Sequence, residues 1–257
     1  MPGFSVHARF LVFAGFLAVT THAQTNLLTV QSGEKQTALL ELYSSEGCSS
    51  CPPAEEWLSK LKESPGLWRE FVPVAFHVDY WDYLGWRDRW GTKYFSNRQR
   101  DYAAHWRSDS VYTPGFVLNG SEWRDWSNHK TVPTAGGVKS GVLMASSSDT
   151  NHWRVTYAPA MAGETRYEAH AALLSGGLVS DVKAGENRGR KLSHDFVALN
   201  LVSAPMVRDG DSLAGEFAFG PHDDAANGRL AIAVWVTKKG HLEPLQAAGG
   251  WLNSAPR

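Results

Sequence analysis

The chain has 257 residues, of which 43% are hydrophobic and 20% are charged. This length fits one large or two small domains, and this composition excludes an intrinsically disordered protein. The formal net charge of −1 at pH 7 excludes the strongly basic balance typical of nucleic-acid-binding proteins, so we expect no nucleic-acid partner.

The first 23 residues are typical of a secretory signal peptide. Arg9 precedes an apolar stretch at 10–19, which is too short to span a bilayer, and Ala23 offers a small residue for cleavage. An uncleaved membrane anchor is the alternative. Because no later stretch reaches ~18 apolar residues, we expect a mature protein that is not transmembrane. The predicted location is outside the cytoplasm, in a bacterium the periplasm, where disulfides persist.

The next part of the chain predicts a strand–helix–strand unit. Residues 24–36 are polar and form an N-terminal extension, whereas the apolar runs 37–43 and 71–78 predict two buried strands. One helical face follows the first run at the spacing i, i+3, i+4, i+7, and it consists of Ala54, Trp57, Leu58 and Leu61. A crossover of this kind favours parallel pairing of the two strands.

Residues 79–90 are rich in aromatic and charged side chains without a clean period, and we interpret them as an aromatic insertion. Residues 95–106 favour a second helix. Residues 111–120 predict a short strand that ends at an Asn-Gly turn, with 121–126 as its hairpin partner.

A domain boundary near residue 135 is indicated by frequent glycine, serine and proline at 131–148. Beyond it, short β-like runs recur with turn signals between them, at a spacing typical of a β-sandwich. These runs are 152–157, 166–174, 178–182, 196–202, 215–219, 230–236 and 241–247. The predicted fold class is therefore α/β for a domain at 37–135, followed by an all-β, sandwich-like domain at 136–257.

Both cysteines lie in one tetrapeptide, CSSC at 48–51, at the predicted helix N-terminus. The pKa of a thiol is lowered there, which makes it a nucleophile near neutral pH. The spacing predicts a redox-active disulfide as the only cofactor, with Cys48 as the attacking thiol and Cys51 as the resolving thiol. A structural disulfide or a reduced, buried pair is the alternative.

These segments in this order resemble the thioredoxin superfamily: a strand, CxxC at a helix N-terminus, a helix, a strand, a helix, and the run YTPGFVLNG at 112–120. More narrowly, ELYSSEGCSSCPPAE, HVDYWDYLGW and YTPGFVLNG look like a family of bacterial secreted thioredoxin-like proteins of unassigned function. The resemblance implies a thioredoxin-like fold at 37–135 and an exposed Cys48. It also implies a cis bond before Pro114, which would turn the backbone of Thr113 outward into a substrate groove.

Glu41 is the candidate proton acceptor for Cys51, because the superfamily keeps a buried acid near this place. A buried carboxylate has a raised pKa and can act as a general base, whereas a solvated glutamate at a strand edge is the alternative. His77, Asp79 and Trp81 are possible accessory residues that line the groove or fix the insertion.

Two further groups leave alternatives open. Cys48, Cys51 and His77 could together bind copper or zinc, although a histidine at a strand end is more often a hydrogen-bonded structural residue. The segment AGENRGRKLSH at 184–194 resembles a signature of the same secreted family. It is either a solvated loop, or a contact that docks the β-rich region on the redox region or binds an anionic partner.

The sequence thus predicts a secreted thiol–disulfide oxidoreductase. Its substrates would be protein or peptide thiols and disulfides. An external redox partner would recycle it, because the chain holds no second dithiol. A periplasmic copper- or metal-handling protein and a non-catalytic thioredoxin-like binding module are the alternatives.

Overall fold

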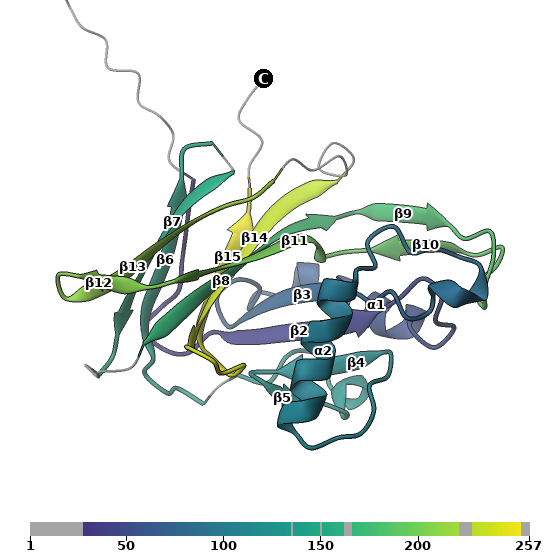
Figure 1. The fold of residues 1–257 in the computed structure, drawn as a ribbon, viewed down its shortest axis with the longest axis horizontal. Helices are drawn as coiled ribbons and strands as arrows, with labels where there is room; N and C mark the ends of the chain where they lie inside the picture. The colour runs from purple at the N-terminus through teal and green to yellow at the C-terminus, as the bar shows by residue number, and fades with distance from the viewer. Residues whose placement is uncertain (1–27, 135, 150, 162–165, 221–227, 253–257) are drawn as a thin grey trace, which may run out of the picture.

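The computed structural model describes residues 28–134, 136–149, 151–161, 166–220 and 228–252 (Figure 1). Strands dominate the regular structure in these ranges, which contain two α-helices, α1 (Pro52–Lys60) and α2 (Lys93–His105). Neither helix has the length and apolar character that crossing a membrane requires, and no other described helix has them. The predicted signal peptide lies outside the described residues.

An eight-stranded sheet runs through the molecule in the order β15-β14-β8-β11-β3-β2-β4-β5. The first half of the chain contributes β2 (Ala38–Ser44), β3 (Phe71–His77), β4 (Gly115–Leu118) and β5 (Ser121–Glu122). The second half contributes β8 (Tyr167–Gly176), β11 (Val197–Pro205), β14 (Arg229–Lys238) and β15 (Pro244–Trp251). The two sets meet where β3 pairs in parallel with β11, at Ala75 and Val197.

A second sheet of five strands covers part of the first (Figure 1). Its order is β1 (Leu28–Gln31), β6 (Gly141–Ser147), β7 (His152–Pro159), β13 (Ser212–Ala218) and β12 (Val207–Asp209). Leu143 and Val155 of this sheet share one hydrophobic core with Ile232 and Val234 of β14. Burial of such apolar side chains is the main stabilising term of the interface between the two sheets.

A two-stranded antiparallel sheet, β9 (Leu178–Asp181) and β10 (Lys191–His194), extends beside α1 (Figure 1). It reaches this place because β11, which follows β10, pairs with β3. The connection between β9 and β10 carries the segment at 184–190.

The predicted fold class, a thioredoxin-like α/β domain followed by a separate β-sandwich, is wrong. The protein is mostly β. Strands from both halves of the chain belong to one eight-stranded sheet, whereas we expected each half to form its own sheet in its own domain. Local patterns did predict the unit β2-α1-β3, in which Ala38–Ser44 pairs in parallel with Phe71–His77. These local patterns did not predict that β11 pairs with the edge of β3 that faces away from β2. The predicted boundary near residue 135 stays a prediction.

Candidate functional site

The two cysteines lie in a tight turn between β2 and α1. Cys51 is the N-cap residue of α1, and its carbonyl oxygen accepts the N–H groups of Ala54 at 2.9 Å and Glu55 at 3.1 Å. Pro52 starts the helix, where its missing N–H costs no hydrogen bond. Both cysteines are free thiols, and both are fully buried with 0% exposure. The expectation of an exposed Cys48 is therefore wrong.

The two thiols differ in acidity. A hydrogen bond from Cys51 is the largest influence on Cys48 and lowers its pKa to about 6, although burial acts in the opposite direction. Burial raises the pKa of Cys51 well above its ordinary value, and the hydrogen bond to Cys48 raises it further. The pair therefore shares one proton near neutral pH, with the proton on Cys51 and the negative charge on Cys48.

The Thr113–Pro114 peptide bond is cis, which confirms the expectation from the resemblance. The carbonyl oxygen of Thr113 lies 3.6 Å from Cys48 Sγ and accepts a 3.4 Å hydrogen bond from Ser50 Oγ. This carbonyl thus faces the thiol turn, whereas we expected the backbone of Thr113 to turn outward. Trp81 Nε1 donates to Thr113 Oγ1 at 2.8 Å, so Trp81 fixes the same segment from the aromatic insertion.

The segment at 184–190 packs on the thiol turn. Asn187 is fully buried, and its Nδ2 donates to the carbonyl oxygens of Glu46 at 2.9 Å and Cys48 at 2.8 Å. The N–H of Ser49 donates to Glu186 Oε2 at 3.0 Å. The docking interpretation of this segment is therefore correct, although Arg188 and Arg190 remain exposed.

Glu41 is buried, as expected, and lies in an ion pair, whereas its role as proton acceptor for Cys51 stays a prediction. Its carboxylate is buried and accepts two hydrogen bonds from Arg98, at 2.8 and 3.0 Å. The hydroxyls of Tyr43 and Tyr102 donate to it at 2.9 and 2.6 Å. Although burial opposes the charge on Arg98, Glu41 raises the pKa of Arg98 well above its ordinary value. These contacts make Glu41 the centre of a structural ion pair under the sheet.

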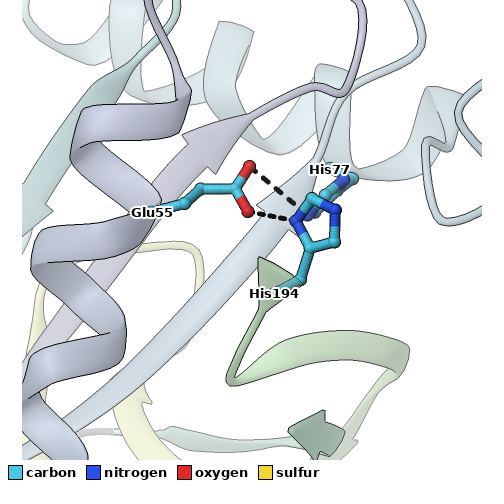
Figure 2. Close-up of side chains that lie close together, drawn as sticks. All are labelled: Glu55, His77 and His194. Carbon is cyan, nitrogen blue, oxygen red and sulfur yellow. Dashed lines mark hydrogen bonds and ion pairs between the residues drawn. The ribbon is translucent and has the colours of Figure 1, made fainter. Parts of the chain in front are cut away.

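A cluster of buried ionisable side chains lies next to the thiol turn. Figure 2 shows Glu55 from α1, His77 from the end of β3 and His194 from the end of β10 pointing toward one another. Ser44 at the end of β2 links this cluster to the strand that leads into the thiol turn, because its hydroxyl donates a hydrogen bond to Glu55 Oε1.

Each histidine of the cluster has an acidic partner on either side. His77 Nδ1 lies 2.7 Å from Asp88 Oδ2, and its Nε2 lies 4.0 Å from Glu55 Oε1. His194 Nδ1 hydrogen-bonds to Glu55 Oε2, and its Nε2 lies 3.3 Å from Glu46 Oε1. Although burial disfavours the charged imidazole, Glu55 and Glu46 raise the pKa of His194 to about 10.

Asp79 and His77, the other two predicted accessory residues, belong to different groups of contacts. Asp79 Oδ1 accepts from Ser96 Oγ at 2.5 Å and so attaches the insertion to α2. In the described ranges, the metal-ligand side chains that converge are Glu55, His77 and His194, so His77 joins a different set from the one with Cys48 and Cys51.

Sequence reasoning missed Glu55, although a signal was present. It follows Cys51 by one helical turn and therefore lies on the same face of α1. The role of His194 had no such local signal, because its partner Glu55 lies 139 positions away in the chain, and nothing in the aromatic insertion distinguished Asp88 from its other acids.

Comparison with known proteins gives a family and a fold. Residues 39–237 match the family described as Protein of unknown function (DUF1223). Comparison with curated proteins finds no match. A crystal structure of a protein from Agrobacterium tumefaciens is similar over 88% of this chain and 98% of that one, with 22% identity and a TM-score of 0.56. HBP35 of Porphyromonas gingivalis is similar over 86% of this chain and 76% of that one, with 10% identity and a TM-score of 0.55. At these identities the two structures show a shared fold alone, and the sequence match shows that the chain belongs to the DUF1223 family.

Proposed function

We propose that the protein is a thiol–disulfide oxidoreductase whose redox centre is the Cys48–Cys51 pair. The observation that carries this proposal is the unequal state of two free thiols in one turn. The pKa of Cys48 is lowered to about 6, and the pKa of Cys51 is raised. A nucleophilic thiolate beside a protonated thiol is the arrangement that two-step exchange needs.

In the reducing direction, the Cys48 thiolate attacks one sulfur of a substrate disulfide. A mixed disulfide with Cys48 forms, and the other substrate sulfur leaves as a thiolate. Cys51 then attacks Cys48 Sγ, and its proton passes to the departing second substrate sulfur. The substrate disulfide gains two electrons, and the Cys48–Cys51 pair loses two as its own disulfide forms. The oxidising direction is the reverse of these steps.

The substrate class we infer is a protein or peptide disulfide, with an external partner that recycles the pair. Thr113 and Pro114 border Cys48, so an extended substrate would bind along this segment. Because Cys48 is buried, substrate has to displace part of its cover. The contacts of Asn187 and Glu186 with the turn make the segment at 184–190 the part that moves.

The local arrangement of the thiol turn and the cis-proline supports a functional relation to thioredoxin-like proteins, independent of the overall fold. We also infer export, to the periplasm in a bacterium, from the signal-like residues 1–23. An exported protein would work where disulfides persist.

The test is turnover of a peptide disulfide by the purified chain in the presence of an added thiol reductant. The Cys48→Ser variant is expected to lose turnover, and the Cys51→Ser variant to accumulate a covalent adduct with the peptide, detectable by mass spectrometry. Ser148→Ala is the matched control, since Ser148 is an exposed serine outside the thiol turn. Turnover that survives in Cys48→Ser would remove the proposal.

The complete burial of both sulfurs favours one second candidate, a non-catalytic binding module. The reduction potential of the pair separates the two functions. A pair that equilibrates with a glutathione buffer supports exchange chemistry, and a pair that stays inert to both oxidised and reduced glutathione supports the binding module.

A further inference from the structure

We propose that Glu55, His77 and His194 form a binding site for a divalent transition-metal ion, with Zn²⁺ as the reference occupant. Each of the three side chains offers one ligand atom, and these atoms lie within 4.8 Å of one another. The three come from separate elements, α1, β3 and β10, and converge at one buried point (Figure 2). Two imidazole nitrogens and one carboxylate oxygen form a ligand set that zinc and neighbouring divalent ions accept in proteins.

His77 is oriented as a metal-binding histidine is. Its Nδ1 lies 2.7 Å from Asp88 Oδ2, and Asp88 is itself fixed by the N–H groups of Glu46 at 2.9 Å and Trp90 at 3.0 Å. This contact leaves Nε2 directed toward Glu55, fully buried and without a hydrogen-bond partner. A carboxylate behind the non-ligating nitrogen is the usual support of a histidine ligand, because it fixes the ring and the tautomer.

His194 also lies between two carboxylates, but here Nδ1 is the nitrogen that faces the common point and Nε2 the one that faces the second carboxylate. Its Nδ1 faces Glu55, and its Nε2 lies 3.3 Å from Glu46 Oε1. Neither Nε2 nor Glu46 Oε1 has a hydrogen bond, although both are buried. Each histidine therefore has one nitrogen toward the common point and one toward a carboxylate. A simple Glu55–His194 ion pair would not require the second histidine with its own carboxylate.

The three ligand atoms, which lie within 4.8 Å of one another, would have to rearrange to bind one ion. With metal–ligand bonds of about 2.0–2.2 Å, tetrahedral ligand atoms are about 3.3–3.5 Å apart. Glu55 Oε1 and His77 Nε2, at 4.0 Å, would move together by about half an ångström relative to that geometry. Glu55 and His194 would separate as their direct hydrogen bond gives way to the ion.

The charge of the cluster is compatible with a bound cation. Three buried carboxylates, those of Glu46, Glu55 and Asp88, surround two imidazoles. Buried charges are stable only when they are compensated. A divalent ion bound to neutral imidazoles would offset two of the three negative charges, and would thus take over the compensation that protonated histidines supply without it.

A surface pocket borders the cluster on the side of Glu55 and His194. This pocket of about 330 Å³ is lined by these two residues, together with Pro52, Lys191 and Asp195. An ion could enter from this pocket, which also leaves room for a water ligand. Neither cysteine belongs to the ligand set, so the metal site and the proposed redox function can fail separately.

The test is metal titration of the purified chain after treatment with a chelator. Zn²⁺ binding is measured by calorimetry, and Co²⁺ binding by visible absorption. We expect one ion per chain, cobalt bands of a nitrogen and oxygen site, and no thiolate-to-cobalt charge-transfer band. His77→Gln and His194→Gln are each expected to weaken binding at least about tenfold. His152→Gln is the control, because His152 is an exposed histidine that pairs with Asp149.

Asp88→Asn leaves all three ligands in place and is expected to weaken binding about 10–100-fold. Circular dichroism establishes which variants are folded. If the histidine variants unfold, the double variant Cys48→Ser/Cys51→Ser decides: unchanged cobalt binding supports the site, and loss of binding overturns it. Absence of saturable binding by the wild-type chain, or equal binding by folded His77→Gln and His194→Gln, would also overturn the proposal.

Discussion

The side-chain amide of Asn187 donates a 2.8 Å hydrogen bond to the carbonyl oxygen of Cys48, although 139 positions separate the two residues. A second bond from the same nitrogen reaches the carbonyl of Glu46. A residue of the β-rich half of the chain thus holds the turn that carries the thiols. The geometry and the accessibility of the redox centre therefore depend on both halves of the chain.

Asn187→Ala removes both hydrogen bonds: the buried carbonyl of Glu46 loses this donor, whereas that of Cys48 keeps the N–H of Cys51 at 3.3 Å. We expect the free energy of unfolding to fall by about 1–3 kcal/mol. We also expect faster alkylation of Cys48, because its cover is held less firmly. Chemical denaturation and the rate of reaction with iodoacetamide measure the two effects. Asn97→Ala, at an exposed position of α2, is the control and should change neither.

The alkylation rate of Cys48 should follow its thiolate fraction. With a pKa of about 6, the rate is half-maximal near pH 6 and is constant by about pH 8. An ordinary thiol, with a pKa of about 8.5, would still react faster as the pH rises beyond that point. Cys51→Ala removes the hydrogen bond that lowers the pKa, so the midpoint should move upward. A midpoint that stays near pH 6 in this variant would show that another group stabilises the thiolate.

Glu41→Gln tests the structural role of the buried ion pair. The substitution leaves Arg98 without its buried counter-charge, so we expect a loss of about 3–5 kcal/mol in the free energy of unfolding. The pH midpoint of Cys48 alkylation should not change, because Glu41 is bound by Arg98, Tyr43 and Tyr102. A shifted midpoint would restore Glu41 as a residue of the thiol site.

Gly47→Ala tests the packing of the aromatic insertion against the thiol turn. A Cβ atom at residue 47 would lie 2.8 Å from Trp81 Cβ, too close for two carbon atoms. We expect a loss of about 1–3 kcal/mol in the free energy of unfolding, as in other overpacked cores. Gly33→Ala, where nothing lies within 4 Å of the added atom, should be near neutral in the same denaturation experiment.

The parts of the fold that the sequence predicted are those that depend on neighbouring residues. The helical spacing after Cys51 and the apolar runs of β2 and β3 are local patterns, and the structure confirms them. The parts that were missed depend on distant pairing. β6 lies within the segment 131–148 in which we predicted a domain boundary, and its alternating burial was hidden by surrounding glycine and serine.

The same reasoning applies to the site. The cis bond at Pro114 could be expected from a short segment, because the segment itself carries the resemblance. The burial of Cys48 could not, because Asn187 is distant in the chain. Glu55 looked like a helix-surface acid, and only the fold places His194 against it.

The parallel pairing of β3 with β11 has a consequence for how such a protein can evolve. Ala75 and Val197, which pair there, lie two positions before His77 and three positions after His194, so this pairing brings the two histidines into the same region of the fold. A relative truncated after the first half of the chain would lose His194 and Asn187 together. A recombination event that moved the CSSC segment alone would leave Asn187 and His194 behind. The two halves of the chain therefore have to be inherited together to keep these contacts.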